Sequence, residues 1–462
     1  MRQSPMVTLR RLYTSLLLLA PLITAYELDL DSKKSILDIS RSIAYKMMTF
    51  YPGNKTGGIP GLFGDPYYWW EAGAAFGVGD TQSAINLTDY WYYTGDEGYV
   101  NVTTEAMLHQ VGPDQNYMPP NQSKSLGNDD QGFWALSAMS AAEKNFPNPP
   151  SDQPQWLALS QAVFNSQAAR WDTLKCGGGL RWQIFTFNDG YVYKNTVSNG
   201  CFFQLGARLA RYTRNSTYAE WAEKAYDWTE SIGLLSKDYK LFDGSDSNLN
   251  CSELNHIQWS YNSGLYMAGA AYMYNYTNGQ ERWRTRLSGL LNATDVFFIN
   301  NTMAEVACES SDTCDVDQRS FKAYTSRFMA LTVQMAPWTA DLIMPKLRTS
   351  AKAAARHCSF GEDKNTCGMI WTQEGWDNKY GVGEQMCALE TIQSNLIKSV
   401  APPVTADNGG TSMGNPGAGT GGDRAVSAPQ TSPTTQGDRI GAGFLTAFVI
   451  ILMVMGGYFM II

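Results

Sequence analysis

The sequence predicts an all-α fold, a closed barrel of paired helices, on three observations. Apolar residues recur with helical spacing through nearly all of residues 26–400. Runs of alternating β-branched residues, which would indicate strands, are few. No fixed repeat length recurs along the chain, as a solenoid would require. We therefore expect one large domain of about a dozen helices, with its functional residues in loops at one end.

The expected helices follow the apolar pattern in chain order. In the first, 32–50, Ile36, Ile39, Ile43 and Met47 fall on one face. The same periodicity predicts helices over 131–145, 155–171, 200–212, 218–234, 256–274, 281–298, 320–336 and 383–397. Residues 181–187 and 191–194 alternate instead, and Asn188-Asp189-Gly190 between them favours a tight turn. A short β-hairpin is expected there.

Both ends of the chain have the features of targeting segments. Residues 1–25 combine basic residues, an apolar stretch over 16–22 and small residues near Thr24-Ala25, which is typical of a secretory signal peptide. Residues 401–438 are rich in Gly, Pro, Ser and Thr, as in a linker, and 439–462 are almost continuously apolar with no charge after them. Small residues, a polar spacer and an apolar tail predict a GPI-anchor signal. A tail-anchoring helix is the alternative, although Lys or Arg normally follows such a helix.

The anchor could be attached at any of several small-residue stretches, namely Asn408-Gly409-Gly410, Asn415, Gly421-Gly422 and Ser427-Ala428. The sequence does not choose between them. In either case we expect a protein that is secreted through the endoplasmic reticulum and held at the outer face of the plasma membrane or in the cell wall.

Glycosylation sequons and cysteines support an extracellular domain. Nine Asn-x-Ser/Thr sequons lie between the two ends, at Asn54, Asn86, Asn101, Asn121, Asn215, Asn250, Asn275, Asn292 and Asn300. The eight cysteines are even in number, as expected in an oxidising compartment. They form no CxxC pair, so structural zinc is not indicated. Cys308 and Cys314, and Cys358 and Cys367, are close enough in sequence to close local loops, although spacing alone does not fix the pairing.

Several functional classes are not indicated by the composition. The net charge of −8 and the lack of a basic patch argue against nucleic-acid binding. The three histidines show no HExxH spacing, and there is no GxSxG elbow, Walker loop or dinucleotide fingerprint in its expected context. Residues 246–250 resemble the start of a calcium loop but lack its central Gly and closing Glu. We expect no cofactor, no metal and a monomer.

The stretch Gly127-Asn128-Asp129-Asp130-Gln131-Gly132 is the strongest candidate for chemistry. It places two adjacent carboxylates between a glycine-bearing loop and an apolar helix. Two like charges side by side favour one ionised and one protonated carboxyl group. Cleavage of a glycosidic bond requires such a pair, as nucleophile and acid. The alternative is purely structural, because a helix N-cap and an acid in the first turn are both favoured by the helix dipole.

Aromatic residues near loops indicate a sugar-binding groove. The chain holds 14 Trp and 25 Tyr, while its charged fraction is only 17%. They cluster at 67–70, 90–93, 181–183 and 258–262, often beside Gln, Asn or Glu. A flat apolar face with a polar edge suits a pyranose ring. The main candidates for substrate contact are Trp69, Trp70, Trp182, Gln183, Asn199, Tyr261 and Asn262. The alternative for any one of them is a place in the core.

Five segments together resemble one family. They are GNDDQGFWALSAMSAAE (127–143), YYWWEAGAAFG (67–77), CGGGLRWQI (176–184), NGCFFQLGARLARYT (199–213) and QWSYNSG (258–264). In this order, and between the same kinds of terminal segments, they are similar to the fungal Dcw-type mannan endo-1,6-α-mannosidases of glycoside hydrolase family 76. The resemblance implies an (α/α)6 barrel, with Asp129 as nucleophile and Asp130 as general acid/base of a retaining enzyme. It also implies transfer of GPI proteins to cell-wall β-glucan.

Two neighbouring aspartates can meet the geometric demand of that mechanism. Retaining enzymes hold the two carboxyl groups about 5–5.5 Å apart. Consecutive Cα atoms are about 3.8 Å apart, and successive helical side chains diverge by about 100°. Two rival functions are kept open. One is a wall-glycan-binding protein without turnover. The other is a different (α/α)6 enzyme that acts on acidic sugars, which would require basic groove residues beyond Arg181.

Overall fold

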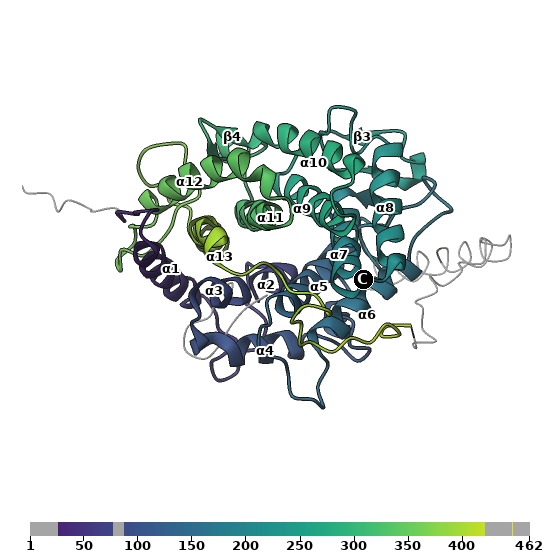
Figure 1. The fold of residues 1–462 in the computed structure, drawn as a ribbon, viewed down its shortest axis with the longest axis horizontal. Helices are drawn as coiled ribbons and strands as arrows, with labels where there is room; N and C mark the ends of the chain where they lie inside the picture. The colour runs from purple at the N-terminus through teal and green to yellow at the C-terminus, as the bar shows by residue number, and fades with distance from the viewer. Residues whose placement is uncertain (1–25, 77–86, 421–445, 447–462) are drawn as a thin grey trace, which may run out of the picture.

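The protein is a barrel of two concentric helical rings (Figure 1). The computed structural model describes residues 26–76, 87–420 and Thr446. In those ranges the inner ring is formed by α2 (Trp69–Phe76), α5 (Asn128–Glu143), α7 (Thr196–Thr213), α9 (Ser260–Tyr276), α11 (Phe321–Met335) and α13 (Val382–Gln393). The outer ring is formed by α1 (Lys33–Met48), α4 (Val100–His109), α6 (Trp156–Ala169), α8 (Ser216–Ser231), α10 (Glu281–Ala293) and α12 (Ala340–Arg356). The short α3 (Leu87–Thr94) precedes α4.

Burial distinguishes the two rings. Every residue of α7 from Thr196 to Tyr212 is buried, and every residue of α13 is buried. Such helices have no solvent-facing stripe because neighbours surround them. Apart from α6, the outer helices bury one face: α1 buries Ile36, Ile39, Ile43 and Met47, the stripe that the sequence predicts. The core therefore lies along the inner ring.

All nine expected helices are present, with bounds that differ by a few residues. Four helices were not predicted, namely α2, α3, α4 and α12. The first two are only eight residues long, and α12 contains Pro345, which normally marks a helix break. In α12 the proline lies in the second turn, and the helix continues to Arg356.

The predicted hairpin is wrong. Residues 181–187 form no strand, because their backbone bonds separately to two segments: the Trp182 N–H donates to the Tyr193 carbonyl (2.7 Å), and Gln183 bridges to Gly127. The strand β1 (Tyr193–Asn195) pairs instead with β2 (Gly244–Asp246), which pairs with β3 (Leu254–Asn255), all antiparallel. A second small sheet joins β4 (Phe298–Ile299) to β5 (Thr302–Met303).

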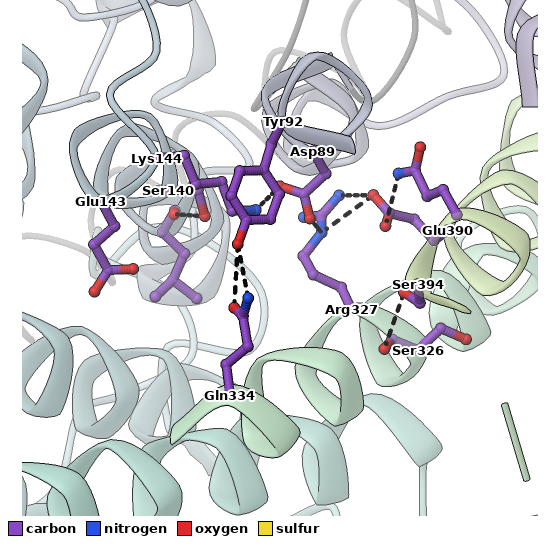
Figure 2. A network of polar contacts seen from close by, with 12 residues as sticks. Asp89, Tyr92, Ser140, Glu143, Lys144, Ser326, Arg327, Gln334, Glu390 and Ser394 are labelled. Carbon is purple, nitrogen blue, oxygen red and sulfur yellow. Dashed lines mark hydrogen bonds and ion pairs between the residues drawn. The ribbon is translucent and has the colours of Figure 1, made fainter. Parts of the chain in front are cut away.

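The two ends of the barrel differ in character. The first turns of five inner helices supply residues to one cavity, so the N-termini of the inner ring lie at a common end, the mouth end. The opposite, closed end holds a network of buried charges (Figure 2). There Arg327 contacts Asp89 (3.3 Å) and Glu390 (2.7 Å), and Lys144 also pairs with Asp89. Burial alone would raise the pKa of Asp89, but Lys144 and Arg327 outweigh it and keep that pKa below its usual value.

A second buried ion pair extends this network. Arg208 donates to Glu143 (2.7 Å) and to the Ser140 hydroxyl (2.8 Å), and the Tyr272 hydroxyl donates to the same Glu143 oxygen (2.9 Å). The arginine and the glutamate are almost completely inaccessible to solvent. A buried pair of this kind is stable only while each charge has its partner.

Residues 401–420, here called the strap, pack against the closed end and α6 (Figure 1). Arg211 donates to the Pro403 carbonyl (2.8 Å), and the Val404 N–H donates to the Glu143 carbonyl (2.7 Å). Further on, the Leu157 N–H donates to the Ser412 hydroxyl (3.0 Å). The composition assigns this segment to a linker, yet it covers α6, which is consequently buried on more than one face.

Three disulfides close loops of the barrel. Cys308–Cys314 and Cys358–Cys367 form as expected from their spacing, and Cys176 pairs with Cys251. Cys201 and Cys387 are unpaired, and both are buried in inner helices. The predicted signal peptide (1–25), the apolar segment 439–462 apart from Thr446, and the sequon at Asn86 lie outside the described residues. Among the helices that the structure describes, none has the length and apolar character to cross a membrane.

Candidate active site

A cavity of about 590 Å³ opens at the mouth end of the barrel. Aromatic side chains and polar groups share its wall, which suits a ligand with apolar faces and hydroxyl edges. Six aspartates line it, whereas Lys124 is the one base among its described lining residues. The N-termini of the surrounding inner helices point toward this wall, and their partial positive charge favours carboxylates there. The six are Asp129, Asp130, Asp189, Asp243, Asp315 and Asp317.

Asp129 and Asp130 both lie in the first turn of α5 and face the cavity. Asp129 is only 8% exposed. Its Oδ1 accepts from the Asp130 backbone N–H (3.1 Å), and its Oδ2 accepts from the side-chain amide of Asn195 (3.2 Å). Asp130 is half-buried, and its Oδ2 accepts from the Gly127 N–H (2.6 Å). Asp130 therefore also caps the helix, so the structural and the catalytic interpretations of this residue are compatible.

Both carboxyl groups hold protons more tightly than usual. Burial raises the pKa of Asp130 to about 7. Burial, and then the adjacent charge of Asp130, raise the pKa of Asp129 as well. Two such neighbours share about one proton near neutral pH. Two N–H groups donate to Asp129 and one donates to Asp130, which favours ionisation of Asp129, whereas the deeper burial of Asp129 opposes it.

The start of α5 is held by a half-buried arginine. Arg170 donates through Nε (2.9 Å) and a terminal nitrogen (2.8 Å) to Oδ1 of Asn128, whose Nδ2 donates to the Arg181 carbonyl (2.9 Å). Gln167 donates to the Asn128 carbonyl (2.7 Å), and the Asn128 N–H donates to the Trp182 carbonyl (2.8 Å). These bonds fix the residue immediately before the aspartate pair.

Five of the seven predicted substrate-contact residues line the cavity, namely Trp69, Trp70, Trp182, Gln183 and Tyr261. Trp182 is the most accessible of them, at 38%. Trp69 and Trp70 are largely buried, because Trp69 packs at a tilt against Trp134 (5.2 Å between centroids) and Trp70 against Phe133 (4.9 Å). They form part of the inner wall and do not project as an open platform.

The other two predictions are wrong. Asn199 does not line the cavity: its side chain lies in the core and bonds both the N–H (2.8 Å) and the carbonyl (3.1 Å) of Leu180. It fastens the 180 loop to α7. Asn262 is fully buried in α9 and also lies off the cavity wall, and neither of its amide atoms has a partner among the described residues. A helical neighbour of a cavity residue points about 100° away from it.

Sequence reasoning missed the cavity residues that come from separate loops. Asn195, at the N-cap of α7, is the side-chain partner of Asp129. Asp243 accepts from Tyr193 (2.7 Å), Trp259 (3.0 Å) and Asn255 (3.2 Å). The pKa of Asp317 rises to about 9, through burial and then through the proton-sharing neighbour Asp315. No local motif marks these positions, because the fold assembles them.

Seven of the described sequon residues are exposed: Asn54, Asn101, Asn121, Asn215, Asn250, Asn292 and Asn300. Asn275 differs, because it is half-buried at the end of α9. Its Oδ1 accepts from Arg211 (2.9 Å), and its Nδ2 donates to the Met335 carbonyl (3.3 Å). Among the described residues, no group of three or more metal-ligating side chains is arranged to hold a metal ion.

Comparison with known proteins identifies the family. Residues 35–407 match the model of glycosyl hydrolase family 76. This chain belongs to glycoside hydrolase family 76. Family 76 relatives include the mannan endo-1,6-alpha-mannosidases DCW1 of Eremothecium gossypii and Saccharomyces cerevisiae, each 49% identical. The matches cover 91% and 92% of this chain and 92% and 93% of those proteins. This family 76 protein is therefore a glycoside hydrolase.

Solved family 76 structures have the same architecture. Dfg5 from Chaetomium thermophilum, in complex with glucosamine, is 47% identical with a TM-score of 0.81, covering 85% of this chain and 97% of that one. An inactive α-1,6-mannanase variant from Salegentibacter sp. HEL1_6, in complex with α-1,6-mannotriose, is 14% identical with a TM-score of 0.61. It covers 78% of this chain and 99% of its own. The (α/α)6 barrel that the resemblance implies is confirmed.

Proposed function

We propose that this family 76 enzyme is a retaining, endo-acting α-1,6-mannosidase or transglycosylase that acts on mannan or GPI glycans in fungal cell-wall biogenesis. The observation that carries the proposal is the pair Asp129 and Asp130, side by side in the wall of the mouth cavity. The names of relatives at 49% identity support α-1,6-linked mannose as substrate. In the mannanase variant from Salegentibacter, the inactivating changes are likewise at two consecutive aspartates.

In this mechanism Asp129 is the nucleophile and Asp130 the general acid. The ionised carboxylate of Asp129 attacks the anomeric carbon while Asp130 donates its proton to the leaving glycosidic oxygen. A covalent glycosyl-enzyme results. Asp130, now ionised, then takes a proton from water or from a sugar hydroxyl while that oxygen bonds to the anomeric carbon, and the bond from this carbon to Asp129 breaks. With water the outcome is hydrolysis, and with a β-glucan hydroxyl it is transfer to the wall.

The cavity favours a neutral or cationic glycan over an acidic one. Six aspartates against one lysine would repel a uronic acid. Arg181, the base that an acidic-sugar enzyme could have used, pairs with Asp172 (2.7 Å) and is not part of the cavity wall. This observation disfavours the acidic-sugar alternative.

We also propose attachment of a GPI anchor after Thr420. Two of the candidate attachment stretches, Asn408-Gly409-Gly410 and Asn415, lie within the strap. Cleavage there would remove contacts such as that of Ala418, whose carbonyl accepts from Asn165 (2.7 Å). Retention of the whole strap is therefore favoured. This placement is compatible with a secreted monomer that is held at the outer face of the plasma membrane.

Incubation of residues 26–420 with an α-1,6-mannoside of GPI type, with and without a β-1,3-glucan oligosaccharide, tests the proposed reaction. Mass analysis of the products separates the outcomes. Shortened mannosides indicate hydrolysis, and a mannosyl-glucan product indicates transfer. Binding without any product, under conditions where Asp129→Asn binds equally well, would favour the non-catalytic glycan-binding alternative.

A further inference from the structure

Three aromatic side chains pack together on the loop between α12 and α13. Phe360 and Trp376 stack almost in parallel, with centroids 5.3 Å apart and planes 6° apart. Tyr380 lies 6.2 Å from Trp376 and is 56% exposed. These three residues are called the ledge. An aromatic ring exposed to this extent on a glycosidase is a candidate for ligand contact.

The loop that carries the ledge is held rigidly. Asp377 accepts from the N–H groups of Met369 and Ile370 (2.7 Å each) and of Lys379 (3.0 Å). His357 bonds the carbonyls of Ala353 (2.8 Å) and Gln373 (3.0 Å), and the Cys358–Cys367 disulfide closes the beginning of the loop. Exposed aromatics on a fixed frame lose little conformational entropy when a ligand binds.

The ledge is continuous with the wall of the cavity on two sides. Tyr380 leads through Gly381 to Val382, whose N–H donates to the Tyr67 hydroxyl (3.2 Å). The next residue, Tyr68, lines the cavity and is 55% exposed. On the other side, Lys379 pairs with Asp312 (3.1 Å), in the segment that supplies Asp315 and Asp317 to the cavity. The segment that carries the ledge is therefore joined directly to two segments that line the cavity.

We propose that the ledge binds a pyranose residue of a glycan chain that also occupies the cavity. The exposed face of Tyr380 stacks on the C–H face of the sugar, and Trp376 and Phe360 support the tyrosine from behind. The ledge thereby adds a distant subsite that short ligands do not reach. This inference rests on the proposed function, because it takes the cavity to be the glycan site.

Binding measurements in the double variant Asp129→Asn/Asp130→Asn test the ledge without turnover. Calorimetry compares α-1,6-mannotriose with a long α-1,6-mannan fragment, and a long β-1,3-glucan fragment forms a third arm. Tyr380→Ala is expected to weaken binding of a long fragment about three- to tenfold, as for loss of one aromatic contact. Mannotriose affinity should not change. Tyr380→Phe, which keeps the ring, should bind like the parent, and so should Tyr276→Ala at the closed end.

The fragment whose affinity depends on Tyr380 identifies the glycan chain that occupies the ledge. If Tyr380→Ala weakens binding of the long mannan fragment or of the long β-glucan fragment, the ledge is supported and that glycan is its occupant. The ledge would be overturned if the parent and Tyr380→Ala bound both long fragments with equal affinity. It would also be overturned if Tyr380→Ala lost as much affinity for mannotriose as for a long fragment. If no mannoside binds even with Tyr380 intact, the proposed function fails, and the ledge fails with it. Normal mannotriose binding without a Tyr380 effect rejects the ledge alone.

Discussion

The side-chain amide of Asn195 joins two roles. Its Nδ2 donates to Oδ2 of Asp129 (3.2 Å), and its Oδ1 caps α7 by accepting from the Ser198 N–H (3.3 Å). The same residue ends β1, which pairs with β2. The small sheet and the α7 terminus therefore set the position of the carboxylate that we assign as nucleophile.

Replacement of Asn195 should impair catalysis more than folding. Asn195→Ser can keep the helix cap but does not reach Asp129, so we expect kcat to fall about ten- to a hundredfold through misplacement of the nucleophile. Asn195→Asp should keep the cap and place a like charge against Asp129, which raises the pKa of Asp129 and moves the acidic limb of the pH–rate profile upward. Unchanged kcat in Asn195→Ser, with an unchanged melting temperature, would contradict the positioning role.

Exchange of either aspartate should abolish turnover without unfolding the protein. Asp130→Asn removes the transferable proton, and we expect a loss of about 10²–10⁴-fold with an unactivated leaving group. An activated aryl leaving group should recover much of this rate, because it needs no acid. Asp129→Asn should not recover with the same substrate. Recovery of both variants, or of neither, would speak against the assigned roles.

The pKa of Asp130, about 7, fixes one limb of the pH profile. The general acid must be protonated at the start of the reaction, so kcat/KM should fall as pH rises through about 7. In Asp130→Glu the limb should move, whereas in Asp189→Asn, at another part of the cavity wall, it should stay. A basic limb that is unaffected by changes at position 130 would reject Asp130 as its source.

Buried carboxyls should make the fold more stable in mild acid than in base. Burial raises the pKa of Glu71 to about 8, of Glu305 to about 8 and of Glu384 to about 7. In the unfolded chain such groups titrate near about 4. Between these pKa values the folded state binds more protons than the unfolded chain. The contribution of these groups to the stability of the fold is therefore greatest below about pH 4 and is lost as pH rises through 7 to 8. Melting temperatures at pH 5 and pH 8 measure the difference.

Glu71 offers a matched test of that pH dependence. One of its oxygens accepts from the Tyr68 N–H (2.7 Å), and the other has no partner among the described residues. Glu71→Gln cannot ionise, so the decline of the melting temperature between pH 5 and pH 8 should become smaller. Glu362→Gln, on an exposed loop, should leave the decline as in the parent. Parallel pH curves for Glu71→Gln and the parent would exclude Glu71 as a contributor.

Removal of one charge of the Arg208–Glu143 ion pair should destabilise the fold more than removal of both charges. Arg208→Met leaves Glu143 buried without its cation, and we expect a loss of about 3–5 kcal/mol. The double variant Arg208→Met/Glu143→Leu removes both charges and should recover much of that loss. Chemical denaturation of the three proteins gives the comparison. No recovery in the double variant would mean that the arginine acts through Ser140 and not through Glu143.

The sequence predicts the helical scaffold well and the walls of the site only partly. Nine helices and the aspartate pair could be found because helical periodicity and adjacent like charges are local signals. Asn199 and Asn262 were placed in the site by their neighbours in sequence, and helix geometry turns both away from it. Asp243 and Asp317 join the wall through loops far apart in the chain. The aromatic run at 90–93 belongs to α3, whose Tyr92 and Asp89 join the closed-end network, and not to the groove.

The two ends of the barrel are stabilised by different interactions, with the three disulfides at the mouth end. At the mouth end, Cys308–Cys314 and Cys358–Cys367 each close a loop between an outer helix and the next inner helix, and Cys176–Cys251 joins the α6–α7 loop to the α8–α9 loop. The closed end is held by ion pairs and the strap. Thiol reductants should therefore lower the activity before they unfold the helical barrel. Loss of the buried ion pairs should lower the stability of the barrel first. Activity and fold stability thus depend on interactions at opposite ends of the protein.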